Sequence, residues 1–331
     1  MGKTIQTVMG PIQPEQLGVT LTHEHLSFDC KTLYERAHPE IRFSRERICA
    51  ENRAAVMKDL NTVLYVYGDN LHFGEPDEIA EELRFYKEAG GQSILEVTTI
   101  DLARDPLRLR AISEKTGLNI IMGGAYYHFP SLPEQTKAFI LDSGVNGLAD
   151  FFIRELEEGV AGTGVRPGVI GEVGPGEDEG SAIIMHAAAI AQRETGVPAI
   201  VHYATMDTLR IFEEERADIS KLVMGHWGLE FPVDEAIRRG AMISFDQFGM
   251  NFPGIKGDDE RITEVLTMLE KGYGNRLLLS QDVCWKIRLK QCGGDGYGYL
   301  LTDILPQLKA RGVTEEQIQT IMIDNVKTLF Q

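Results

Sequence analysis

The sequence predicts an α/β fold of the (β/α)8 type, a TIM barrel, and three observations support this prediction. Eight short apolar runs alternate with amphipathic stretches of helical length. Several runs are nearly continuous in Val, Ile, Leu and Met, which is typical of parallel strands buried on both faces. The length of 331 residues suits one large barrel. An open doubly wound sheet is the alternative that these patterns leave open.

The expected strands and helices follow one another through the whole chain. The strands are Gly18–Thr22, Gln92–Thr98, Leu118–Gly123, Gly168–Val173, Pro198–His202, Lys221–His226, Ala241–Phe245 and Arg276–Gln281. The helical patterns between them are Pro76–Ala89, Asp105–Thr116, Gly180–Thr195, Ala204–Arg216, Pro232–Arg239 and Asp259–Lys271. Several of these patterns end at a glycine or a basic residue, the usual signals of a helix C-terminus. We therefore expect one domain over residues 1–331.

One segment departs from the simple repeat. Residues 28–91 form a long excursion between the first and second strands, with helices expected over Arg45–Tyr67 and Pro76–Ala89. Long connections after barrel strands lie at the face that carries the active site, where they often form lids or subunit contacts. We expect this excursion to be a lid or a contact within a homodimer, and a surface decoration is the alternative.

Composition limits the partners that the chain can bind. The formal net charge of −17 at pH 7 repels phosphate backbones and anionic lipid headgroups. The first residues contain no apolar signal core. We therefore expect a cytoplasmic protein that binds a small molecule, with no nucleic acid and no membrane as partner. The four cysteines form no Cys-x-x-Cys pair and are expected to be reduced, and Cys284 is interpreted as a bystander rather than a nucleophile.

Side chains that can bind metals stand at or just beyond the ends of five of the apolar runs. They are His23, His25, Glu172, His202, His226 and Asp282. Residues two apart on a strand point to the same side, so His23 and His25 can reach one ion while Glu24 turns away. The carboxyl ends of barrel strands meet at the face where barrel enzymes carry their active sites. The sequence therefore predicts a metal site that the fold gathers from several strands.

The number of donors favours two ions over one. A single catalytic zinc ion uses three protein ligands, whereas four imidazoles and two carboxylates suit two divalent ions about 3.5–4 Å apart. Zinc is the expected metal, although manganese, cobalt and iron accept the same donors. Water shared by two such ions has its pKa lowered to about 7, which provides a hydroxide nucleophile at neutral pH. Asp282 is the expected catalytic proton acceptor.

Six motifs occur in order along the chain. They are Thr22-His23-Glu24-His25-Leu26, Glu96-Val-Thr-Thr followed by Arg104-Asp105, Gly168-Val-Ile-Gly-Glu172-Val-Gly, His202, Gly225-His226 and Ser280-Gln-Asp282-Val. Together they resemble the phosphotriesterase-related branch of the phosphotriesterase family, within the amidohydrolase superfamily. The resemblance implies a barrel with a binuclear centre. It places His23, His25 and Asp282 at the more buried ion, His202 and His226 at the other, and Glu172 as the bridge.

Two departures from the phosphotriesterases themselves direct the functional prediction. Glu172 stands where those enzymes and the related lactonases have a carboxylated lysine, and Gln247 and Leu229 stand where a proton relay is expected. We therefore expect a hydroxide-based hydrolase of a small lactone or carboxylic ester. An N-acyl amide hydrolase with the same site is the alternative, a phosphotriester hydrolase is a third, and a non-catalytic, metal-stabilised binding protein is the alternative from a different class.

Five further side chains follow strand ends and are candidates for contact with the carbonyl substrate. Tyr126 or Tyr127 could donate to the carbonyl or leaving oxygen. Arg104, Lys286 and Arg288 could bind an anionic group on the substrate. Packing is the competing role for the tyrosines, and ion pairing within the protein is the competing role for the three cations.

Overall fold

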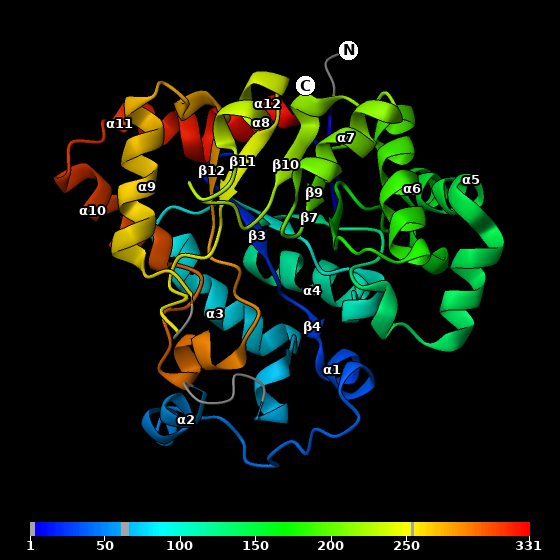
Figure 1. Cartoon of the computed structure of the whole chain (residues 1–331). Coiled ribbons are helices and arrows are strands. Elements are labelled where there is room, and N and C mark those ends of the chain that lie inside the picture. The colour runs from blue at the N-terminus through cyan, green and yellow to red at the C-terminus, as the bar shows by residue number, and fades with distance from the viewer. Residues whose placement is uncertain (1–3, 61–65, 253–254) are drawn as a thin grey trace.

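The computed structural model is a barrel of parallel strands surrounded by helices (Figure 1), and it describes residues 4–60, 66–252 and 255–331. The predicted fold class is confirmed, and every predicted strand is present. The barrel strands are β3 (Thr20–Glu24), β6 (Ser93–Glu96), β7 (Asn119–Met122), β8 (Ile170–Val173), β9 (Ala199–Val201), β10 (Leu222–Met224), β11 (Met242–Phe245) and β12 (Leu277–Leu279).

Hydrogen bonds close the barrel at two seams. The strands pair in the orders β3-β6-β7 and β12-β11-β10-β9-β8, all in parallel. At the first seam the Asp282 amide donates to the His23 carbonyl at 3.1 Å. At the second seam the Gly168 amide donates to the Met122 carbonyl at 2.8 Å. Because both seams are bonded, these strands present no open edge to solvent.

Helices follow the strands and cover the barrel. They are α3 (Pro76–Glu88), α4 (Pro106–Thr116), α5 (Glu134–Glu158), α6 (Glu179–Thr195), α7 (Met206–Glu214), α8 (Val233–Arg239), α9 (Asp258–Glu270), α10 (Leu305–Ala310), α11 (Glu315–Gln319) and α12 (Asn325–Leu329). Local sequence fixes their ends, as α4 illustrates. The Asp105 side chain accepts from the amides of Leu107 and Arg108, and Gly117 ends the helix at φ +71°.

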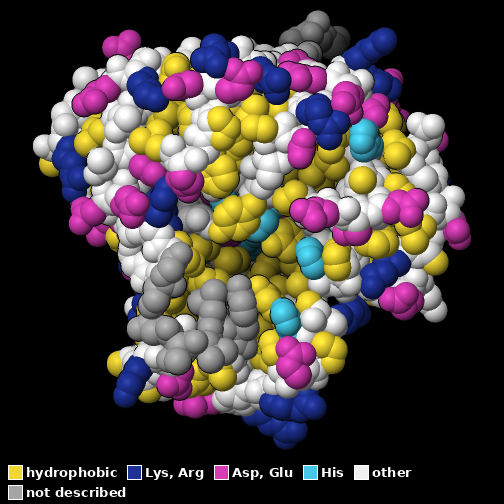
Figure 2. All heavy atoms as spheres, viewed as in Figure 1, with side chains coloured by type: hydrophobic (Ala, Val, Ile, Leu, Met, Phe, Trp, Pro, Cys, Tyr) yellow, Lys and Arg dark blue, Asp and Glu magenta, His cyan; other side chains and the backbone are white. Residues whose placement is uncertain are grey.

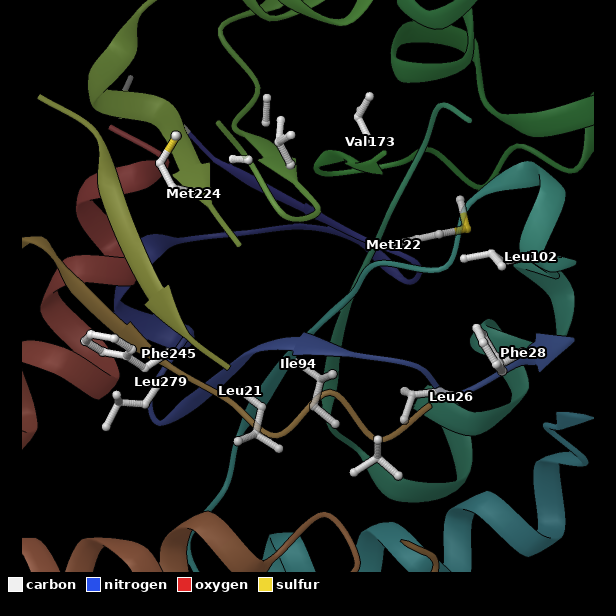
Figure 3. Close-up of a cluster of buried hydrophobic side chains, with 14 of the residues drawn as sticks. Leu21, Leu26, Phe28, Ile94, Leu102, Met122, Val173, Met224, Phe245 and Leu279 are labelled. Carbon is white, nitrogen blue, oxygen red and sulfur yellow. The ribbon is translucent and has the colours of Figure 1, made fainter. Parts of the chain in front are cut away.

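Alternating residues on the strands build two layers of core. One set fills the barrel interior and includes Leu95, Ile121, Ile200, Val223 and Leu278. The other set faces the helices, and Figure 3 shows side chains of this layer. Because neighbouring strand residues point to opposite faces, continuous apolar runs supply both layers at once. Ile5 and Leu17 near the N-terminus and Leu329 and Phe330 near the C-terminus pack against the interior set.

The excursion after β3 differs from its prediction. Strand β4 (Phe28–Asp29) pairs in an antiparallel manner with β5 (His72–Phe73), and helix α1 (Lys31–Ala37), which the sequence did not predict, lies between them. Of the helix expected over 45–67, the described residues contain α2 (Arg53–Leu60), while residues 45–52 and 66–67 are not helical. Residues 61–65 lie outside the described part. The Asn52 side chain accepts from the Cys49 amide and donates to the Arg47 carbonyl, which favours a turn in place of an earlier helical start.

The described helices include none that is both long and apolar enough to cross a membrane.

Candidate metal centre

The predicted donors converge at the carboxyl end of the barrel, around the carboxylate of Glu172. Its Oε2 lies 2.7 Å from Nδ1 of His202 and 3.2 Å from Nε2 of His23. Its Oε1 lies 3.3 Å from Nε2 of His25. All of these side chains are buried except His202, whose side chain is 18% exposed. The fold therefore brings donors from β3, β8 and the end of β9 to one point.

Asp282 and His226 complete the cluster. Oδ1 of Asp282 lies 3.3 Å from Nε2 of His25, and its Oδ2 lies 3.8 Å from Nε2 of His226. That Nε2 of His226 also lies 2.9 Å from Nδ1 of His202. Two groups of donor atoms, each within 4.8 Å of one another, are His23, His25 and Asp282, and His23, Glu172 and His226. All six predicted residues thus lie within one cluster, with His23 in both groups.

The chemistry of this cluster fits divalent cations. Glu172 and Asp282 are buried carboxylates, and within the described residues no lysine or arginine forms an ion pair with either of them. A buried anion without a cationic partner is strongly destabilising. Their ion-pair partners in the described part of the chain are imidazoles, so a bound metal or protonated histidines must balance the charge. Nitrogen and oxygen donors of this kind suit zinc and similar metals.

The pKa values of the metal-free cluster reflect the same pairing. Burial alone would raise the pKa of Glu172, but the imidazoles of His202 and His23 hold it well below its usual range. Burial lowers the pKa of His25, yet the carboxylates of Asp282 and Glu172 outweigh that effect and raise it to about 9. Glu172 is therefore ionised at neutral pH, ready to bind a cation.

Three of the histidines contact residues behind the cluster to which the sequence analysis assigned no role. Asp246, directly after β11, lies 2.7 Å from Nδ1 of His226 and 3.1 Å from Nδ1 of His23. The Thr98 hydroxyl lies 2.8 Å from Nδ1 of His25 and donates to the buried Glu96 at 2.5 Å. The place of Asp246 just past a strand end, like that of the predicted donors, is a signal that could have revealed it.

Glu24 turns away from the metal cluster, as predicted, and has a structural role there. Its carboxylate accepts from the Ser280 hydroxyl at 2.7 Å and from the amides of Gln281 and Val283 at 2.8 and 2.9 Å. These donors flank Asp282 on both sides. Glu24 therefore joins β3 to the turn after β12 and fixes the backbone that carries Asp282.

A cavity of about 330 Å³ opens above the cluster. His25, Glu172, His202 and Asp282 lie at one side of it. Its other walls are mostly apolar and include Phe28, Leu33, Leu102, Met250, Ile255 and Trp285. Figure 2 shows a hollow on this face with hydrophobic walls and histidine side chains within it and near its rim. Helix α1 contributes Leu33, Tyr34 and Ala37, so the start of the excursion forms one wall of the site.

The predicted substrate contacts divide into one that reaches the cavity and four that do not. Tyr127 lines the cavity, and its hydroxyl lies 2.9 Å from Nε2 of His202. Tyr126 is buried and packs near Phe152, with 6.2 Å between ring centroids. Packing is thus the role that the structure gives Tyr126.

The three predicted cationic contacts are engaged within the protein. Arg104 pairs with Glu155 at 2.9 Å, and Lys286 pairs with Asp69 at 3.1 Å. Arg288 is buried and donates to the backbone carbonyls of Gln281, Asp282 and Phe248. None of the three lines the cavity. Acceptors within the protein therefore already engage the charge of all three side chains, which agrees with ion pairing, the competing role.

The surroundings of Gln247, Leu229 and Cys284 agree with the interpretation drawn from the sequence. Gln247 lines the cavity and donates to the Tyr203 hydroxyl at 3.3 Å, whereas the amide of Leu229 donates to Glu264. Neither side chain is ionisable, so neither can act as the relay found in phosphotriesterases. Cys284 also lines the cavity, but burial raises the pKa of its thiol well above the usual value, which opposes a nucleophilic role.

Comparison with known proteins gives matches along nearly the full length. The sequence model of the Phosphotriesterase family matches residues 3–330. N-acetyltaurine hydrolase from Mus musculus is 36% identical over 346 residues, which cover 98% of this chain and 96% of that protein. The crystal structure of a resiniferatoxin-binding protein from Rhodobacter sphaeroides superposes with a TM-score of 0.89 at 32% identity, covering 99% of this chain and 95% of that one.

A lactonase is also among the similar structures. A mutant of a PTE-like lactonase from Deinococcus radiodurans superposes with a TM-score of 0.78 at 28% identity, covering 99% of this chain and all of that one (100%). These matches confirm the family resemblance that the ordered motifs indicated.

Proposed function

Since this chain is a hydrolase that belongs to the phosphotriesterase family, we propose that it uses two divalent ions to cleave a small lactone or carboxylic ester. One observation supports the proposal most strongly. Four imidazoles and two carboxylates meet beneath a cavity whose walls are mostly apolar. A planar acyl group with an apolar chain fits such a site.

The six donors are assigned to two ions on the basis of their positions. His23, His25 and Asp282 would hold one ion, His202 and His226 would hold the other, and Glu172 would bridge them. When bound, the ions would supply Lewis acidity and lower the pKa of water, so that a nucleophile forms at neutral pH. Because Glu172 carries its own carboxylate, the bridge needs no carbon dioxide.

Two side chains of the cavity would act on the substrate. Asp282 would accept the proton of the attacking water and pass it to the leaving oxygen, since its carboxylate lies at the cavity wall. Burial raises the pKa of the Tyr127 hydroxyl well above its usual value, so the phenol stays protonated. If His202 binds metal through Nδ1, its Nε2–H donates to the Tyr127 oxygen, which leaves the phenol proton free for the substrate carbonyl or leaving oxygen.

The cavity favours an uncharged acyl chain. Of the described residues that line it, none is a lysine or an arginine. His128 lies in the cavity wall, but burial lowers the pKa of its ring and opposes a positive charge there. His38 also lines the cavity, and its Nδ1 faces Glu40 Oε1 at 3.5 Å. An anionic tail on the substrate would therefore meet no lysine or arginine among the described residues of this cavity. Lactones and esters with aliphatic or aromatic acyl groups are the class that these walls accommodate best.

An N-acyl amide is the second candidate, and a relative supports it. The Mus musculus protein that is 36% identical over nearly the whole chain is named an N-acetyltaurine hydrolase. Amide and ester cleavage require the same nucleophile and the same proton transfer to the leaving atom. The two candidates therefore share one site and differ only in the substrate that fits it.

The test is a kinetic comparison on one metal-loaded preparation. Aliphatic lactones, phenyl esters, N-acetyl amides with and without a terminal sulfonate, and paraoxon-like phosphotriesters would be compared at equal size. We expect kcat/KM for an acyl substrate to exceed that for the phosphotriesters by at least about a hundredfold, near 3 kcal/mol at the transition state. Preference for the sulfonated amide would favour the second candidate, and equal turnover of phosphotriesters would refute both.

Metal content gives an independent check. Elemental analysis of active protein should find two divalent ions per chain, and chelation should remove activity until a metal is restored. Full activity with one ion or none would refute the two-ion proposal.

A further inference from the structure

Asp246 contacts two of the predicted metal-binding histidines at once. It follows the last residue of β11, is 1% exposed and lies behind the metal cluster. Its Oδ1 is 2.7 Å from Nδ1 of His226, and its Oδ2 is 3.1 Å from Nδ1 of His23. The His226 amide also donates to Oδ1, at 3.1 Å. The contact with His226 is a hydrogen bond, whereas Nδ1 of His23 lies at ion-pair distance and makes no hydrogen bond in this ring orientation. One carboxylate therefore faces two imidazoles through separate oxygens.

The geometry determines which nitrogen each ring offers to the cluster. A histidine that donates Nδ1–H to a carboxylate keeps the lone pair of Nε2 for a metal, and the same contact holds the ring orientation. The Nε2 atoms of His23 and His226 point to the shared Glu172, at 3.2 and 3.9 Å from its Oε2. In the proposed assignment these two histidines belong to different ions.

We propose that Asp246 is a positioning residue shared by both metal sites, where it fixes the tautomer and ring orientation of one histidine ligand of each ion. This inference rests on the proposed function, because it takes the two-ion assignment as its starting point. Charge within the described chain supports it. The salt-bridge partners of Asp246 are these two histidines, with no lysine or arginine among them.

The remaining two histidines have separate anchors, which makes a matched control available. His25 is held by Thr98 through its Nδ1, and His202 is held by Tyr127 through its Nε2. Among the described residues, neither anchor is hydrogen-bonded to a second histidine of the cluster. Loss of the Thr98 hydroxyl should therefore weaken one ion, whereas loss of the Asp246 carboxylate should weaken both.

The experiment measures the affinity of each ion in chelator-treated protein. Wild type, Asp246→Asn and Thr98→Val would be titrated with Zn²⁺ in competition with a chromophoric chelator, and Co²⁺ spectra would be recorded for each. We expect Asp246→Asn to lower the affinity of both ions, each by about 10–100-fold, and to alter the Co²⁺ spectrum. Thr98→Val should lower the affinity of one ion only. An Asp246→Asn protein that binds one or both ions with wild-type affinity would overturn the shared role.

Further outcomes distinguish failure of this inference from failure of the proposed function and from misfolding of the variant. A wild-type chain that binds fewer than two ions would refute the two-ion site itself, and the inference with it. Two ions in wild type with unchanged affinities in Asp246→Asn would refute the shared role alone. If Asp246→Asn does not fold, Asp246→Ser takes its place. Serine is shorter than aspartate and has one oxygen, so it cannot replace both contacts, which Asp246 makes through separate oxygens. The affinity of at least one ion should therefore still fall, and unchanged affinities would again overturn the role.

Discussion

The buried ion pair of Arg104 and Glu155 allows a sharp test of what Arg104 does. Its Nη2 lies 2.9 and 3.0 Å from the two carboxylate oxygens of Glu155, and its Nη1 donates to the Gly123 carbonyl at 3.1 Å. The Arg104 side chain is 3% exposed and that of Glu155 is 12% exposed. Replacing Arg104 by methionine retains much of the side-chain volume but leaves a nearly buried carboxylate without its partner.

The size of the effect follows from that burial. Removing one member of a buried pair costs about 3–5 kcal/mol in the free energy of unfolding. Glu155 keeps some access to water, so we expect the lower end, about 3 kcal/mol, for Arg104→Met. The double variant Arg104→Met with Glu155→Leu removes both charges and should recover most of this loss. A double-mutant cycle in urea, at constant metal concentration, measures the coupling between the two side chains.

Enzyme kinetics decide whether Arg104 has a structural role or binds the substrate. If it is a structural residue, kcat/KM of folded Arg104→Met should stay within about threefold of wild type for neutral and anionic substrates alike. A variant that unfolds at the wild-type urea concentration, yet loses activity selectively toward anionic substrates, would contradict the structural role and restore substrate binding.

Three further predictions concern the metal centre. Asp282→Asn removes the proton acceptor, so turnover should fall by about a thousandfold or more, on the order of 4 kcal/mol, while circular dichroism shows an intact fold; near-normal turnover with both metals bound would exclude Asp282 as the proton carrier. Reconstitution of the chelated enzyme should need metal but no bicarbonate, since Glu172 is its own bridge, and a bicarbonate requirement would point to a carboxylated lysine. In the metal-free chain the pKa of His25 is raised to about 9. The stability that this raised pKa contributes should be complete below about pH 6.5 and lost as the pH rises through about 9, so thermal unfolding in chelator should occur at a lower temperature near pH 9.5 than near pH 6.5, and a rise would contradict the pairing with Asp282 and Glu172.

The barrel could be predicted because its strands carry a strong local signal. A parallel strand covered on both faces is mostly apolar, and several of the eight runs are nearly continuous in apolar residues. Helix α5 was not predicted, although it runs from Glu134 to Glu158, because it contains Gly144 at φ +58° in the middle of its helical pattern. The start of α2 also could not be read from the sequence. The side chain of Asn52 competes with the helix for backbone hydrogen bonds, and that contact exists only in the folded turn.

The metal donors were predictable for a similar reason, since histidines directly after buried strands are conspicuous. The residues behind them carry a weaker signal, because a carboxylate just past a strand end does not reveal which side chains it contacts. Asp246 shows its role only through the two imidazoles that it faces, which come from β3 and from the turn after β10. Arg104 and Arg288 were candidates for substrate binding because partners distant in sequence cannot be seen in advance. Contacts that depend on distant segments therefore set the limit of the sequence interpretation.

Three residues at the mouth of the barrel have backbones in the left-handed region, where side chains other than glycine are strained. They are Tyr203 at φ +40°, Asp282 at φ +50° and His226 at φ +56°. A residue held in such a conformation costs of order 1–3 kcal/mol, which the surrounding structure must offset. Selection for thermal stability alone would therefore relax these turns, for example by introducing glycine, and would lose metal donors as it did so. Thermostable variants of this chain should gain their stability at positions away from the barrel mouth, because the sequence best suited to the site is not the sequence best suited to the fold.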